Sequence, residues 1–170
     1  MSIFDRLTGT RSPDSGVEPL PIMEVRAALM ALNGPDVPFV VRNARPSEQA
    51  DLVAEWHVQE PATGSGRLRR QLDRTFKTRM RLVSAKREVR ALEEQWRTTL
   101  TGDPPRPSRS REYGRGPQPT ISREWTYERG PDGRRHKVET FHFDSREMKT
   151  PLRQTVLDAG WTWRGVLFRL

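Results

Sequence analysis

Apolar and polar residues alternate in several segments of this chain, and this pattern predicts β-strands. In residues 51–58 (DLVAEWHV), Leu52, Ala54 and Trp56 alternate with polar side chains. In residues 74–84 the apolar positions alternate with lysine and arginine. A strand at 74–84 would bury one face and present a basic face to water.

Residues 88–99 (EVRALEEQWRTT) allow two interpretations. Their alanine, leucine, glutamate and glutamine favour a helix, whereas the short connection to 74–84 favours a second, paired strand. We predict the strand. Further along, segments 122–127 and 136–143 flank the sequence Gly-Pro-Asp-Gly, which is typical of a hairpin turn.

Two segments have helical signals. Ile22, Val25, Leu29 and Leu32 form one apolar stripe after a proline pair. Thr150-Pro151 has the residues expected at the start of a final helix, and a last strand follows over 161–168. Together these elements predict an α+β fold: a curved, mainly antiparallel sheet of about six or seven strands, with an N-terminal and a C-terminal helix.

Composition predicts which parts of the chain belong to the folded domain. Residues 1–20 have few apolar residues and are expected to form a flexible tail, followed by a single domain over 21–170. The Pro/Arg-rich stretch 101–120 has little to pack, and we expect it to be a disordered insertion in that domain. A small apolar cluster in the tail leaves peripheral membrane contact open; its members are Ile3, Phe4 and Leu7.

Three segments carry a resemblance. ADLVAEWHV (50–58), REVRALEEQW (87–96) and TPLRQTVLDAGWTWRGVLF (150–168), in this order, resemble a small family of uncharacterised actinobacterial proteins. The family has no assigned activity, so the resemblance implies no catalytic residues. It does imply that 74–84 and 88–99 are paired strands. The chain departs from the family pattern at 101–120.

Charge is concentrated in the middle of the chain. Residues 61–120 contain 15 Lys and Arg against 6 Asp and Glu, whereas residues 1–60 contain 5 against 9. Arginine is suited to phosphates and carboxylates, so this block predicts an anionic partner, either nucleic acid or an acidic protein surface. An ordinary solvated face has the same composition and remains an alternative. The candidate anion-binding residues are Arg67, Arg69, Arg70, Arg74, Lys77, Arg79 and Arg81.

Aromatic residues provide a second candidate site. Bulky rings on neighbouring strands either fill the core or line a pocket for an apolar ligand. The candidate lining residues are Trp56, Trp96, Trp125 and Trp163. A pocket enzyme, or a carrier of a small apolar ligand, is therefore the alternative to a binding protein.

Several other chemistries lack the residues they need. The chain has no cysteine, and its three histidines are too scattered to predict a metal site. It has no phosphate-binding glycine motif and no nucleophile elbow. No apolar run is long enough to span a bilayer, and the first residues do not have the pattern of a secretory signal. We therefore expect a cytoplasmic, non-catalytic binding protein with no cofactor and no metal.

Overall fold

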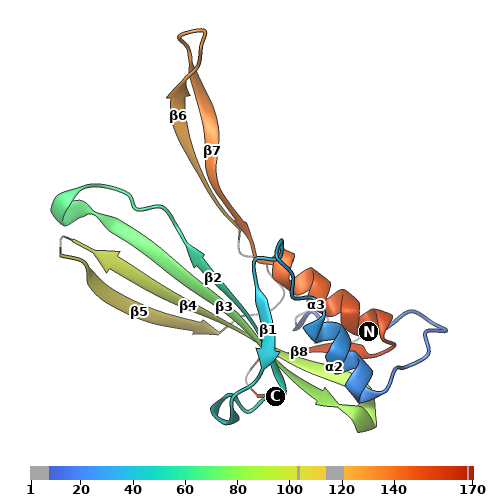
Figure 1. The fold of residues 1–170 in the computed structure, drawn as a ribbon. Coiled ribbons are helices and arrows are strands. Elements are labelled where there is room, and N and C mark those ends of the chain that lie inside the picture. The colour runs from blue at the N-terminus through green and yellow to red at the C-terminus, as the bar shows by residue number, and fades with distance from the viewer. Residues whose placement is uncertain (1–7, 103, 114–120, 168) are drawn as a thin grey trace.

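The computed structural model describes residues 8–102, 104–113, 121–167 and 169–170. The fold is α+β (Figure 1). Its helices and strands, in chain order, are α2 (Ile22–Met30), β1 (Val40–Asn43), β2 (Leu52–Gln59), β3 (Arg70–Val83), β4 (Glu88–Thr101), β5 (Arg106–Tyr113), β6 (Ile121–Arg129), β7 (Arg135–Asp144), α3 (Arg146–Asp158) and β8 (Thr162–Val166).

Six strands form the main sheet. Strands β1 to β5 follow one another in the order β1-β2-β3-β4-β5, and every neighbouring pair is antiparallel. Strand β8 is parallel to β4 and pairs with its first half, at Glu88–Leu92, while β5 pairs with the second half, at Glu94–Thr101. The predicted mainly antiparallel sheet is confirmed, and so is the direct pairing of 74–84 with 88–99.

Strands β6 and β7 form a separate hairpin. Its turn contains Gly133, whose φ of 74° favours glycine. Figure 1 shows that this hairpin extends away from the main sheet and that no other strand lies along it. The predicted hairpin is confirmed, and its position outside the main sheet is new.

The hydrophobic core lies between the two helices and one face of the main sheet. Helix α2 buries Val25 and Leu29, and helix α3 buries Met148, Leu152 and Val156. From the base of the hairpin, the Phe143 ring packs against the rings of Trp56 and Phe76, with centroid distances of 4.6 and 4.5 Å. The fully buried Trp161 donates its indole N–H to the Leu20 carbonyl.

Helix α3 begins earlier than predicted. It starts at Arg146, so Pro151 lies inside the helix and not in its first turn. The side chain of Asp144 accepts a hydrogen bond from the Arg146 amide, at 2.9 Å, and so satisfies one of the free N–H groups of the first turn. This local contact starts the helix without the Thr-Pro pair.

The prediction of disorder over 101–120 is wrong where the structure describes this segment. Residues Arg106–Tyr113 form β5, and all eight are paired with Glu94–Thr101 of β4. The pairing uses main-chain hydrogen bonds, so it does not need the apolar side chains that this segment lacks. Residues 103 and 114–120 lie outside the described part.

The predicted flexible tail over 1–20 contacts the domain in its described part, residues 8–20. The main chain of Arg11 exchanges two hydrogen bonds with Trp163 of β8, at 2.8 and 2.9 Å. The Leu20 amide donates to the Ala159 carbonyl at the end of α3. Residues 8–20 are therefore attached to the domain at both ends, while Ile3, Phe4 and Leu7 lie outside the described residues. Among the described residues, no helix is both long enough and apolar enough to cross a membrane.

Candidate anion-binding surface

The register of the main sheet assigns each candidate side chain to one of two faces. Side chains alternate along a strand, and directly paired residues share a face. We call the face with Phe76, Met80 and Leu82 of β3 the core face, because these residues are buried in the hydrophobic core. The opposite face, which carries Lys77, Arg79 and the residues in phase with them, is the outer face.

A carboxylate cluster neutralises the outer face close to β1. The short turn Pro46–Glu48 lies beside this face, and Glu48 accepts hydrogen bonds from Arg42 at 2.8 Å and from Lys77 at 3.2 Å. Glu55 of β2 also accepts from Arg42, at 2.9 Å. The Arg42 guanidinium holds the pKa of Glu48 well below its ordinary value, and the same hydrogen bond raises the pKa of Arg42.

Arg79 and Arg81 are bound to the protein itself. Arg79 donates to the Glu94 carboxylate at 2.9 Å and to the Glu48 carbonyl at 2.6 Å. Arg81 donates to the carbonyls of Gln49, at 2.8 Å, and Leu170, at 3.4 Å. Along the second half of β3, the predicted basic face is therefore engaged in hydrogen bonds within the protein. The guanidinium groups of Arg79 and Arg81 link β3 to neighbouring segments on the outer face.

Arg74 belongs to the other face. Its register partner on β2 is Val58, so it lies in phase with Phe76 on the core face. Its Nε atom is 2.9 Å from an oxygen of Glu60, and the two side chains are only 13% and 9% exposed. Arg74, Lys77, Arg79 and Arg81 are thus all engaged by the protein, and we assign them a structural role.

The other three candidate arginines are exposed at the far end of the sheet. Arg67, Arg69 and Arg70 lie on and just after the loop between β2 and β3. Register brings a further exposed arginine beside them, because Arg70 pairs with Thr101 and Thr101 pairs with Arg106 of β5. We call Arg67, Arg69, Arg70 and Arg106 the arginine tip. None of the four forms an ion pair with another residue that the structure describes.

Main-chain contacts hold the arginine tip in shape. Thr63 and Arg70 exchange two hydrogen bonds of 2.8 Å across the base of the β2–β3 loop. The Gly102 amide donates to the Arg69 carbonyl at 2.9 Å, and this bond joins the loop to the neighbouring β4–β5 turn. Gly64 has a φ of +75°, and a Cβ there would lie 2.5 Å from the Leu68 carbonyl oxygen. The loop therefore needs glycine at this position to make its turn.

The tryptophans predicted to line a pocket do not lie together. Trp56 and Trp163 are buried in the core. Trp96 pairs with Thr75, the neighbour of Phe76, so register places it on the outer face, on the opposite side of the sheet from Trp56. The side chain of Trp125 lies outside the described part. One pocket lined by Trp56, Trp96 and Trp163 is therefore not formed.

Sequence reasoning missed two features of this surface. Arg106 and Arg109 lie in the segment for which we predicted disorder, and both are exposed on β5. The signal that could have indicated β5 was the length of β4, whose second half is long enough to pair with another strand. Within the described residues, no group of three or more His, Asp or Glu side chains is arranged to hold a metal ion.

Comparisons with known proteins add no family. No protein-family model, no curated protein and no solved structure matches this chain. The resemblance to actinobacterial proteins stays a prediction.

Proposed function

We propose that this protein is a non-catalytic binding protein that holds a polyanion at the arginine tip. The observation that carries the proposal is the division of the predicted cations into two groups. Those on the middle of β3 are engaged by carboxylates and carbonyls, whereas Arg67, Arg69, Arg70 and Arg106 are exposed and close together. Exposed guanidinium groups that lie close together are suited to bind phosphate or carboxylate groups of a partner.

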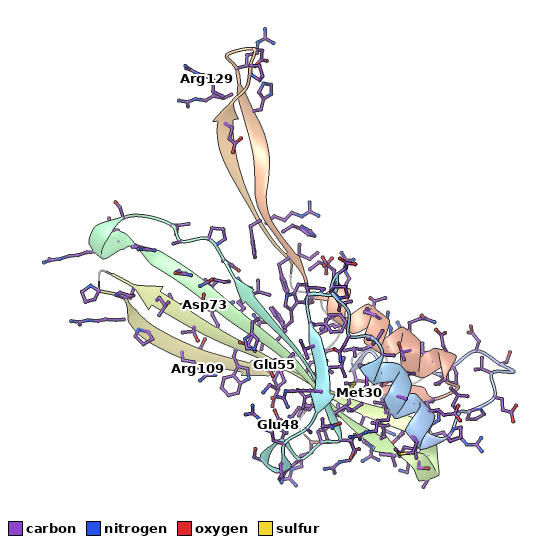
Figure 2. All side chains as sticks on the ribbon, viewed as in Figure 1. Met30, Glu48, Glu55, Asp73, Arg109 and Arg129 are labelled. Carbon is purple, nitrogen blue, oxygen red and sulfur yellow. The ribbon has the colours of Figure 1, made fainter. Side chains whose placement is uncertain are left out.

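The shape of the molecule supports this role. Figure 2 shows that Arg109 and Asp73 lie on the part of the sheet that extends beyond the helices. A charged group at the end of such an extension is accessible to a large, linear partner without a steric conflict with the core. The proposal also uses the cytoplasmic location expected from the sequence, where nucleic acids and acidic protein surfaces are both available.

The test is binding of the full chain to long-chain inorganic polyphosphate, a polyanion with no bases and no side chains. Isothermal titration calorimetry at about 50 and about 200 mM NaCl measures both affinity and its salt dependence. We expect binding that weakens steeply with salt. The triple variant Arg67→Ala, Arg69→Ala, Arg70→Ala should lose at least about tenfold in affinity at the lower salt, because three charge contacts are removed.

A matched control separates position from net charge. Arg129, Arg134 and Arg135 are also exposed, at the end of the β6–β7 hairpin, as Figure 2 shows for Arg129. Their triple alanine variant removes the same charge and should keep most of the affinity. Equal losses in both variants would show a non-local effect of net charge, and no binding of the wild-type chain at the lower salt would overturn the proposal.

A further inference from the structure

We infer that the polyanion is single-stranded nucleic acid, and that a base stacks on Trp96, which lies on the outer face of the part of the sheet that ends at the arginine tip. This inference rests on the proposed function and names the class of partner. The outer face of β2–β4 carries a row of three register partners, His57, Thr75 and Trp96. The row contains two aromatic rings, which is the chemistry that single-stranded nucleic acids use when they bind sheets.

Trp96 differs from the other tryptophans whose side chains are described. Trp56, Trp161 and Trp163 are at most 9% exposed and belong to the core. Trp96 is partly exposed and lies on the face away from the helices. Such a large ring would ordinarily be placed in the core, where burying its surface stabilises the fold. Its position on the outer face leaves part of the ring accessible to a partner.

Arg109 extends this stacking surface. Its guanidinium carbon lies 4.7 Å from the centre of the Trp96 ring, which is a cation–π contact. Arg109 is exposed on β5 and pairs with Thr98. It can therefore contact a phosphate from the same position in which it lies over the ring. A guanidinium stacked over a ring supplies both a stacking surface and a charge to one nucleotide.

The neighbouring charges restrict the path of the nucleic-acid backbone. Asp73 lies on the outer face, in the same cross-strand row as Thr98 and Arg109. Its carboxylate repels phosphates, so the backbone is expected to follow β5 past Arg109 toward the end of the sheet and not to cross β3. His57 lies on β2, at the other end of the row from Trp96; its side chain is 73% exposed and its Nε2 atom is 3.2 Å from a carboxylate oxygen of Glu55.

Double-stranded nucleic acid does not fit this surface in the same way. Its bases are stacked on one another, so they are not free to stack on Trp96, and it could bind only through its phosphates. The inference therefore predicts that binding depends on accessible bases as well as on charge.

The experiment compares two fluorescein-labelled oligomers of about 16 residues: oligo(dT), and an abasic oligomer with the same number of phosphates. Binding of the full chain is followed by fluorescence anisotropy at one fixed salt concentration. We expect oligo(dT) to bind about tenfold more tightly, because stacking adds about 1–3 kcal/mol per base. A duplex of the same length should bind no more tightly than the abasic oligomer.

Variants of Trp96 test the residue itself. Trp96→Leu should reduce the affinity for oligo(dT) to that for the abasic oligomer and leave the abasic affinity unchanged. Trp96→Tyr keeps a ring and should keep a preference for oligo(dT), so it also serves if the leucine variant does not fold. Urea unfolding of each variant checks that the fold is retained.

Each result has a distinct meaning. Equal binding of oligo(dT) and the abasic oligomer would overturn this inference and leave the polyanion proposal intact. A Trp96→Leu variant that loses affinity for both oligomers to the same extent would also overturn it, because the residue would then act through the structure of the sheet. Absence of binding to the oligomers and to polyphosphate would overturn both proposals.

Discussion

At the scale of single residues, most of the cations predicted to meet a partner are used inside the protein. Alternation along the second half of β3 correctly placed Lys77, Arg79 and Arg81 on the face opposite the core. It could not indicate their partners, because these come from elsewhere in the chain: Lys77 contacts Glu48, which is 29 residues away, and Arg79 contacts Glu94. Ion pairs between strands depend on register, and register depends on the whole sheet.

Glu48 should contribute stability that depends on pH. Its pKa lies well below its ordinary value because of Arg42, so the carboxylate stabilises the fold above about pH 4.5, its unfolded value, and less as the pH falls. Glu48→Gln should therefore lower the free energy of unfolding by about 2 kcal/mol at neutral pH. The difference from wild type should shrink below about pH 4.5. Urea unfolding at pH 7 and pH 3 measures both effects.

An exposed glutamate provides the control for Glu48. Glu18→Gln should change the free energy of unfolding by less than about 0.5 kcal/mol at either pH, since surface substitutions have small effects. If Glu48→Gln lowered stability by the same amount at pH 7 and pH 3, ionisation of Glu48 would not be the cause.

At the scale of elements, strands with a buried face or a clear turn signal were predictable, and strand β5, which has neither, was not. Strands β2 and β3 show clear alternation because one face packs against the core. Strand β5 carries mostly polar side chains and pairs through its main chain, so the apolar pattern contains no signal for it. The start of α3 was also missed, because the apolar pattern has no signal for the single local hydrogen bond that the Arg146 amide donates to Asp144.

Gly160 joins α3 to β8 and should not tolerate a side chain. Its φ is +71°, and a Cβ would lie 2.7 Å from the Cα of Pro19 and 2.9 Å from the Glu18 carbonyl oxygen. Gly160→Ala should therefore combine backbone strain with displacement of residues 18–20 from the end of the helix. We expect a loss of about 3 kcal/mol in the free energy of unfolding, measured by urea denaturation.

Gly16 separates the two causes of that loss. Its φ is +94°, but nothing lies within 4 Å of a Cβ placed on it. Gly16→Ala should cost only the backbone strain, about 1 kcal/mol. Similar losses for Gly16→Ala and Gly160→Ala would show that the close approach of Pro19 and Glu18 has no energetic importance.

At the scale of the whole molecule, the core supports two projecting parts. The helices cover only the half of the main sheet that carries β1 and β8, and the long strands β3 and β4 extend beyond it (Figure 1). The hairpin β6–β7 projects separately and is attached at its base, where Phe143 enters the core. The functional surface that we propose lies on the first of these parts, and its end is distant from the residues that determine overall stability.

The two projecting parts should differ in local stability. The first continues strands that begin in the core, with β4 held between two neighbours, whereas the hairpin has only its own two strands. A two-stranded hairpin is marginally stable in water by itself.

Hydrogen–deuterium exchange should therefore show fast exchange for main-chain amides near the end of the hairpin, such as Arg129 and Arg135. Amides of β3 and β4 near Met80 and Ala91 should exchange only through global unfolding. Amides around Thr75 and Trp96 should be intermediate, protected by the continuous strands but with no covering layer. Protection of the hairpin equal to that of Met80 and Ala91 would show instead that it packs against a further surface, such as a second copy of the chain.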